Sequence, residues 1–224
     1  VVTEITRSKS GVLEELNGED TRNMLIYVAD KVMGKKEYLT EIDSAIGDGD
    51  HGMNMNKGFM MFGDEFGDQK FTFADGLDNL GNILFSKIGG SMGPIYGTIF
   101  MDAAEQGMEL EDITVKDLAD MLGAGLAGLQ EIVEAQVGDK TLVDTLAPAV
   151  DVLKKAAEEG TDFPQALEDM KAAAKKGMES TKDMVAKFGR SSRLGERSRG
   201  VLDAGSVSCC IILTAMADGI LENL

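Results

Sequence analysis

The apolar residues of this 224-residue chain recur at the spacing of an α-helix along most of its length. Between Thr21 and Lys35 they fall three or four positions apart, behind Asp20 as a suitable N-cap. Eight further stretches share the pattern: Glu37–Ile42, Met53–Phe66, Phe73–Ile88, Ile95–Gln106, Val115–Glu134, Leu142–Glu159, Phe163–Lys187 and Gly205–Asn223. No alternating apolar run of strand length competes with them. The sequence therefore predicts an all-α fold of about eight antiparallel amphipathic helices.

Local start signals and composition support these helices. Thr114 and Asp117 have the spacing of a capping box, and Pro164 falls in the first turn of its stretch. The chain has no tryptophan and only 5% aromatic residues, whereas β-sandwiches and β-barrels favour aromatic and β-branched residues. Because no linker or repeat divides the chain, we expect one domain over residues 21–224, preceded by a loose N-terminal tail of residues 1–20.

The charge of the chain limits its partners. With 22 Lys and Arg against 39 Asp and Glu, the formal net charge is −17, and such a field repels nucleic acid and anionic membrane surfaces. The sequence has no run of 18 apolar residues and no secretory signal pattern in residues 1–17, which favours a cytoplasmic protein. Cys209 and Cys210 are adjacent in an apolar stretch, as expected of core residues in a reducing compartment.

Glycine gathers between the predicted helices. Many of the 27 glycines fall in four segments, residues 47–52, 89–93, 138–140 and 195–205. Loops so rich in glycine indicate backbone that closely approaches a ligand. The polar residues of these loops are therefore the candidates for a functional site.

The first of these loops contains three carboxylates. Asp43, Asp48 and Asp50 stand five and two positions apart, and a glycine-broken loop after a helix can fold them around one centre. Hard oxygen ligands favour Mg²⁺ over zinc or iron. An EF-hand is excluded, because counting from Asp48 places Phe59 where the twelfth-position glutamate belongs. The alternative is a turn that caps the next helix. His51, the only histidine, is more typical here of a hydrogen-bonding support than of a general base.

Two other segments have the residues of a phosphate site. Gly89-Gly-Ser-Met-Gly93 can present backbone N–H groups to a phosphate, or can be a tight helix connection. Four of the six arginines fall within ten residues, namely Arg190, Arg193, Arg197 and Arg199. Guanidinium groups match phosphate oxygens, so among Gly and Ser these arginines favour an anion site, or an anionic partner, over a solvated basic loop. Without a Walker loop or a G-x-S-x-G elbow, the sequence favours Mg²⁺-dependent nucleotide binding on a helical scaffold.

Five motifs follow one another in the chain: Ile46-Gly-Asp-Gly-Asp-His-Gly-Met-Asn-Met-Asn-Lys-Gly58, Gly89-Gly-Ser-Met-Gly-Pro-Ile-Tyr-Gly-Thr98, Val137-Gly-Asp-Lys-Thr141, Arg193-Leu-Gly-Glu-Arg-Ser198 and Asp203-Ala-Gly205. From about Thr21 to the C-terminus, the sequence resembles the nucleotide-binding L subunits of bacterial dihydroxyacetone kinases. The resemblance implies a barrel of eight antiparallel helices, with a nucleotide and two Mg²⁺ ions in the loops at one end.

The resemblance also implies an activity. In the phosphotransferase-system branch, such a subunit holds ADP, which a partner M subunit rephosphorylates in place. The ATP so formed phosphorylates dihydroxyacetone bound to a separate K subunit, where we also expect the general base. One alternative is a kinase subunit whose ATP exchanges freely, acting on dihydroxyacetone or a related ketose. Another is a module that docks on a transcription regulator.

The resemblance assigns roles residue by residue. It implies Mg²⁺ ligands at Asp43, Asp48 and Asp50, and nucleotide contacts at His51, Gly52, Met53, Asn54, Ser91, Met92, Gly128, Thr141, Leu142, Arg190, Asp203, Ala204 and Gly205. Three residues depart from the family pattern: Ala204 replaces a frequent proline, Met92 a small hydroxyl residue, and Arg193 a tyrosine. The departure at Arg193 weakens the assignment of all four arginines to one phosphate site.

Overall fold

The computed structural model describes residues 18–110 and 112–222, and this part of the chain contains helices and no strands. Its elements are α1 (Gly18–Met33), α2 (Lys36–Ile46), α3 (His51–Phe66), α4 (Phe73–Lys87), α5 (Met92–Gly107), α6 (Val115–Ile132), α7 (Val143–Glu159), α8 (Phe163–Ser180), the 3₁₀ segments η1 (Thr181–Asp183) and η2 (Arg190–Ser198), and α9 (Ala204–Leu221). The all-α prediction is confirmed.

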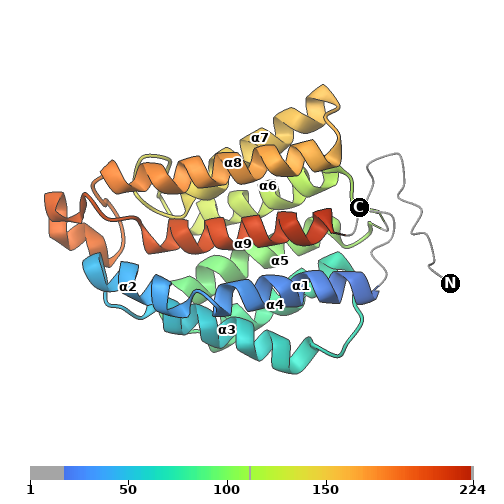
Figure 1. Ribbon diagram of the computed structural model, residues 1–224, viewed down its shortest axis with the longest axis horizontal. Coiled ribbons are helices and arrows are strands. Elements are labelled where there is room, and N and C mark those ends of the chain that lie inside the picture. The colour runs from blue at the N-terminus through green and yellow to red at the C-terminus, as the bar shows by residue number, and fades with distance from the viewer. Residues whose placement is uncertain (1–17, 111, 223–224) are drawn as a thin grey trace.

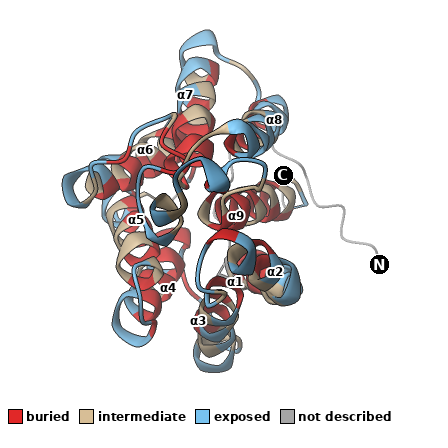
Figure 2. Ribbon diagram, turned by 90° about the vertical axis from the view of Figure 1, so that its left-hand side faces the viewer, coloured by how far each residue is buried: buried red, intermediate tan, exposed pale blue. Residues whose placement is uncertain are grey.

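Eight of the described helices form a closed ring. Along the chain, each helix from α3 to α9 packs against the next, and α9 packs against α1, which in turn contacts α3. The long axes run side by side and alternate in direction (Figure 1). Seen from one end, the ring turns its buried faces inward (Figure 2). The short helix α2 lies outside this ring and contacts α3 and α9.

Local sequence signals fix several helix starts. The side chains of Thr114 and Asp117 form the predicted capping box, with the Asp117 N–H donating to Thr114 Oγ1 at 3.2 Å. Asp162 Oδ1 accepts from the Gln165 N–H, and Pro164 lies in the first turn of α8 as predicted. Helix α1 begins at Gly18, three residues earlier than predicted, so Asp20 lies inside its first turn rather than at the N-cap. Residues 1–17 of the predicted tail lie outside the described residues.

The end of α8 was predicted wrongly. The apolar residues Met184 and Val185 continue the helical spacing of α8, but the helix ends at Ser180. Thr181 accounts for the end, because its hydroxyl donates to the Met178 carbonyl and accepts from the Asp203 N–H at 3.0 Å. At this point the helix stops, and the chain instead makes contacts with residues about twenty positions ahead. No local sequence pattern reveals such contacts.

Helix α9 is the most buried element of the ring. It packs against α1, α7 and α8, and most of its residues are buried, including Cys209 and Cys210. Among the described helices only α9 is long and apolar enough to cross a membrane, and 67% of that stretch is buried inside the protein. A helix that is apolar on all sides and surrounded by other helices is a core helix.

The alternating helices place four connections at the same end. These are the segments between α2 and α3, α4 and α5, α6 and α7, and α8 and α9. They contain all four glycine-rich segments of the sequence. The architecture therefore brings residues that are far apart in the chain to one end of the ring, where the candidate site lies.

Candidate functional site

A pocket of about 840 Å³ opens at this end of the ring. Its walls come from four parts of the chain, within residues 43–54, 89–95, 129–143 and 188–205. Its lining includes carboxylates and an arginine, and also the apolar residues Ile95, Leu129 and Ile132. A cavity of this size with an apolar side and a few converging polar groups is typical of a small-molecule site.

The first wall is the turn from α2 into α3. Asp43 lies on the last turn of α2, which continues to Ile46 rather than ending at the predicted Ile42. The turn is possible because Gly47 lacks a side chain: a Cβ there would lie 2.2 Å from Asp43 Oδ1. Asp43 Oδ2 accepts from the His51 N–H, and Asp48 Oδ1 accepts from the Asp50 N–H, both at 3.1 Å. These bonds aim two carboxyls into the pocket.

Asp43 and Asp48 are in direct contact. Desolvation raises the pKa of Asp43, and the adjacent Asp48 carboxyl raises it further. Desolvation alone would raise the pKa of Asp48, but hydrogen bonds from the Asp50 N–H and from Asp43, together with the Arg190 charge, lower it. Two touching carboxyls cannot both be ionised without a cation beside them. Their chemistry therefore fits a hard divalent cation with oxygen ligands.

The third carboxylate is placed differently from the prediction. Asp50 lines the same pocket, yet no three His, Cys, Asp or Glu side chains within residues 18–110 and 112–222 form a ready metal cluster. The Asp48 carboxylate pairs with the guanidinium of Arg190 and accepts from the Asp50 N–H. The structure brings Asp43 and Asp48 together and leaves Asp50 beside them.

His51 begins α3 and is buried beneath the turn. Its Nε2 lies 2.8 Å from the Ser208 hydroxyl of α9, which lies 2.6 Å from the Tyr96 hydroxyl of α5. Burial lowers the pKa of His51 to about 4, so the ring is neutral at pH 7. A neutral imidazole bonded to a buried serine supports the wall and does not stand ready to take a proton. The contact agrees with the supporting role that the sequence favours.

The second glycine-rich loop runs along the base of α5. Ser91 and Met92 line the pocket together with Gly89, Gly90 and, from α3, Asn54. The first N–H groups of α5 have no partner within the helix, and no side chain caps them. The loop therefore places a helix N-terminus, with its partial positive charge, at the pocket.

The loop between α6 and α7 is held by two aspartates. Buried Asp144 accepts from the N–H groups of Gly138 at 2.6 Å and Thr141 at 2.8 Å. Asp139 accepts from the Gln136 N–H and pairs with Lys187 at 2.6 Å. These bonds present Thr141 and Leu142 to the pocket, as predicted for a ligand-contacting loop.

The N-terminus of α9 completes the pocket. Asp203 Oδ2 caps it by accepting from the Ser206 N–H at 2.8 Å, and desolvation raises the pKa of Asp203 to about 6. Ala204 and Gly205 follow on the pocket wall. The Ser206 hydroxyl donates to the Thr141 carbonyl at 2.5 Å, which ties this wall to the loop after α6.

The four clustered arginines separate in space. Arg190 lines the pocket and pairs with Asp48. Arg199 pairs with Glu196 and donates to the Asp183 carbonyl, while Arg193 and Arg197 are exposed and do not line the pocket. The structure therefore assigns only Arg190 to the candidate anion site.

Some predicted contact residues lie elsewhere. Gly52 packs against α2, where a Cβ would lie 2.2 Å from the Lys36 carbonyl oxygen, and Met53 is 59% exposed. Gly128 packs against α5, where a Cβ would lie 1.6 Å from Asp102 Oδ2. None of these three lines the pocket, whereas the remaining predicted residues do: Asp43, Asp48, Asp50, His51, Asn54, Ser91, Met92, Thr141, Leu142, Arg190, Asp203, Ala204 and Gly205.

Other pocket residues were missed by sequence reasoning. Leu129, Ile132 and Val133 line it from the end of α6. The sequence did hold a signal for them, because they lie just before a glycine-containing loop. Helix ends beside such loops meet at one end of the ring. Lys140, inside the Val137–Thr141 motif, also lines the pocket without having been given a role.

An all-α ring with carboxylates, an arginine and helix N-termini around one end pocket defines a helical domain with a polar end site. The sequence model described as the DAK2 domain matches residues 45–218, and the chain belongs to this family.

Two curated relatives match most of the chain. The Escherichia coli (strain K12) protein named PEP-dependent dihydroxyacetone kinase, ADP-binding subunit DhaL, is 36% identical over 198 residues, covering 87% of this chain and 93% of the relative. The Lactococcus lactis protein named PTS-dependent dihydroxyacetone kinase, ADP-binding subunit DhaL, is 31% identical over 199 residues, covering 84% and 91%. The chain is thus similar to these subunits over nearly their whole length.

A solved structure supports the fold. The dihydroxyacetone kinase from C. freundii in complex with AMP-PNP and Mg²⁺ aligns with a TM-score of 0.69 at 20% identity. The alignment covers 97% of this chain and 37% of that structure. At this identity the likeness establishes the shared fold of the helical domain.

Proposed function

We propose that this chain is the nucleotide-binding subunit of a multi-subunit dihydroxyacetone kinase. It holds ADP or ATP with two Mg²⁺ ions and presents the nucleotide to dihydroxyacetone on a separate K subunit, and an M subunit of the phosphotransferase system rephosphorylates ADP in place. The observation that carries the proposal is the contact of Asp43 with Asp48, together with the pairing of Asp48 with Arg190, in one pocket. Similarity to an ADP-binding subunit along 93% of that relative supports it.

The pocket residues divide into two groups by chemistry. The apolar residues Ile95, Leu129 and Ile132 suit a purine base. The guanidinium of Arg190 and the N-termini of α5 and α9 suit phosphate oxygens. An elongated ligand with an apolar end and an anionic end, such as a nucleotide, satisfies both groups at once.

Asp43, Asp48 and Asp50 would hold the magnesium. Bound there, Mg²⁺ neutralises charge on phosphate oxygens during transfer. Asp43 and Asp48 are oriented for this by N–H groups of the same turn. In this role Asp48 exchanges its contact with Arg190 for the cation, which leaves the Arg190 fork available for phosphate.

The remaining residues position and shield the nucleotide. His51 is neutral and bonded to Ser208, so we place the general base on the K subunit, beside the hydroxyl that is phosphorylated. The subunit then contributes orientation and electrostatic stabilisation, which supply most of the catalysis in phosphoryl transfer. We also place this subunit in the cytoplasm, together with its phosphotransferase partners.

Native mass spectrometry of freshly purified protein with Mg²⁺ tests the resident nucleotide. We expect stoichiometric ADP that survives gel filtration. Rapid exchange between ATP and ADP would instead indicate an ATP-dependent kinase subunit for dihydroxyacetone or a related ketose. Absence of any ADP binding by calorimetry would contradict the proposal.

Reconstitution tests the reaction. With K and M subunits and the general phosphocarriers, the chain should support phosphoenolpyruvate-dependent phosphorylation of dihydroxyacetone with only catalytic amounts of nucleotide. Omission of the M subunit should abolish the reaction, because the resident ADP is then not rephosphorylated. Binding to a transcription regulator without any phosphoryl transfer would favour a regulatory module instead.

A further inference from the structure

The chain between α8 and α9, residues 181–203, forms a loop whose two ends are bonded together. Near its base the Gly200 N–H donates to the Lys182 carbonyl at 2.7 Å, and the Ala186 N–H donates to the Ser198 hydroxyl at 2.9 Å. The Asp203 N–H donates to Thr181 Oγ1 at 3.0 Å. We call this bonded base, residues 181–186 and 198–203, the neck of the loop.

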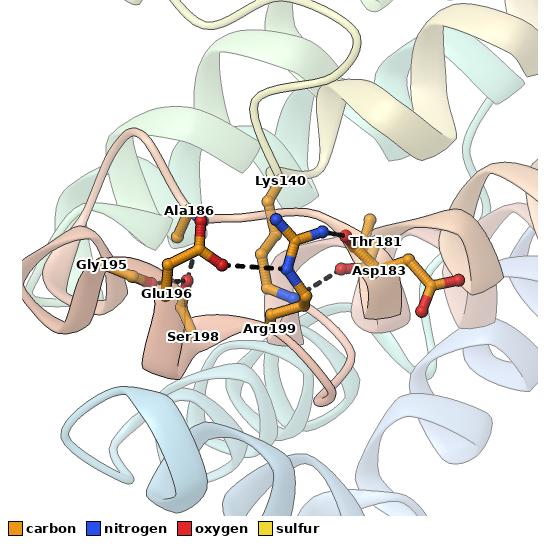
Figure 3. A network of polar contacts seen from close by, with 8 residues as sticks. All are labelled: Lys140, Thr181, Asp183, Ala186, Gly195, Glu196, Ser198 and Arg199. Atoms are coloured by element: carbon orange, nitrogen blue, oxygen red, sulfur yellow. Dashed lines mark hydrogen bonds and ion pairs between the residues drawn. The ribbon is translucent and has the colours of Figure 1, made fainter.

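Lys140 enters the neck from outside the loop. Its ammonium donates to the carbonyl of Thr181 on one side (Figure 3). On the other side it donates to the carbonyl of Val201, and both bonds measure 2.5 Å. Arg199 adds a further bond across the neck, to the Asp183 carbonyl. Lys140 is thus the side chain that joins the two ends of the loop to the segment between α6 and α7.

The placement of Lys140 is costly in two respects. The side chain is 1% exposed, and the hydrogen bonds of its ammonium go to two backbone carbonyls rather than to a carboxylate. Desolvation accordingly lowers the pKa of Lys140. Its backbone also has φ of +63°, in the left-handed region that side chains disfavour. The N–H bonds to Asp144 on either side of it, from Gly138 and Thr141, keep the backbone in that conformation.

The loop above the neck reaches the site. It carries Arg190, which pairs with Asp48 of the carboxylate turn. The segment that leaves the neck leads into Asp203, Ala204 and Gly205 on the pocket wall. Most side chains between residues 187 and 197 are exposed, so the loop itself offers few apolar contacts to fix its position.

We propose that Lys140 is a positioning residue for the nucleotide site: by bridging Thr181 and Val201, it sets where Arg190 and the start of α9 stand relative to the carboxylate turn. The proposal rests on the proposed function, because the expected effect of losing Lys140 is a weaker affinity of the protein for nucleotide. It assigns Lys140 no contact with the reacting groups.

The test compares Lys140→Met, which keeps the volume and removes the donors, with Lys140→Arg, which keeps a cation and several N–H donors. The matched control is Lys182→Met, since Lys182 is exposed and takes part in the neck only through its backbone. Amide exchange is followed without nucleotide in residues 184–202 and 44–54. The Kd for ADP is measured by calorimetry at saturating Mg²⁺.

Lys140→Met should exchange amides in both segments about tenfold faster and bind ADP about tenfold more weakly, because two charge-assisted bonds are lost. Lys140→Arg should recover most of both effects, and Lys182→Met should match the wild type. Unchanged exchange in Lys140→Met would overturn the proposal. Faster exchange with an unchanged Kd would also overturn it, because Lys140 would then be a structural tie alone.

Two further measurements cover the cases in which Lys140→Met does not fold or the wild type does not bind ADP. If circular dichroism finds Lys140→Met unfolded, Thr181→Val serves instead, because it removes the Asp203 and Met178 bonds of the neck without leaving a buried charge. It should raise both exchange and Kd in the same direction by about threefold. If the wild type itself binds no ADP, the proposed function fails, and exchange in residues 44–54 still decides whether Lys140 positions the carboxylate turn.

Discussion

The two charged walls of the pocket are built in opposite ways. The carboxylate wall, residues 43–54, is a tight turn in which neighbouring N–H groups orient the carboxyls of Asp43 and Asp48. The arginine wall, residues 181–203, is a long loop fixed by Lys140 and Asp139, which lie some forty residues earlier in the chain. The first wall is determined by local sequence and the second by distant partners. We therefore expect single substitutions to act sharply in the first wall and in graded steps in the second.

The largest effect is expected from Asp48→Asn. The change keeps the shape of the side chain but removes a negative ligand, so kcat/KM in the reconstituted system should fall at least about a hundredfold. Far-UV circular dichroism should be unchanged. The control is Asp68→Asn, an exposed aspartate at the other end of the ring. If Asp48→Asn kept full activity, the carboxylate wall would have no role in the mechanism.

Gly52→Ala tests how closely the first wall is packed. A Cβ at Gly52 would lie 2.2 Å from the Lys36 carbonyl and 2.7 Å from the Thr40 nitrogen, which are backbone atoms that cannot easily move. The free energy of unfolding in urea should fall by about 1–3 kcal/mol. Gly89→Ala is the matched control, because no atom lies within 4 Å of its added Cβ. Equal stabilities of the two variants would contradict close packing at this wall.

Arg190→Gln tests the second wall. Removing the guanidinium should weaken ADP binding about tenfold by calorimetry, since one charge-assisted phosphate contact is lost. Arg193→Gln should change the Kd less than twofold, because Arg193 is exposed and does not line the pocket. If the two variants weakened binding equally, the arginines would act as one cluster and the division made by the structure would be wrong.

Asp139→Asn should give the smallest effect, and a pH-dependent one. The hydrogen bond from Lys187 lowers the pKa of Asp139 below its ordinary value of 3.8. Its contribution to stability is therefore present above pH 4 and is lost as the pH falls through the lowered pKa. Because Lys187 is largely exposed, the variant should lose less than about 1 kcal/mol at pH 7. Denaturation at pH 7 and pH 2.5 measures this, and a loss independent of pH would contradict the ion pair.

The sequence predicted those features whose causes are local. The capping box at Thr114 and the proline in the first turn of α8 lie within a few residues of the helix ends they fix. The end of α8 was missed, because Thr181 is also bonded to Asp203 and Lys140, which are distant in the sequence. Helical periodicity is a property of adjacent turns and holds no information about such partners.

The same division applies to the site. Asp43, Asp48 and Arg190 were named from sequence because each lies in a motif with an unusual local composition. Gly128 was named too, yet it packs against Asp102 on α5, a contact that only the crossing of two helices reveals. The apolar wall of Leu129 and Ile132 was missed, since apolar residues at a helix end resemble core residues in the sequence.

The position of α9 in the ring has a consequence for synthesis. It follows every other described helix along the chain, yet it contacts α1 and α8 and so closes the ring. It also carries Asp203, Ala204 and Gly205 of the pocket. While the ribosome is still adding α9, the earlier helices expose the faces that α9 will cover. The ring and its ligand pocket therefore form together, only after translation has passed Leu221.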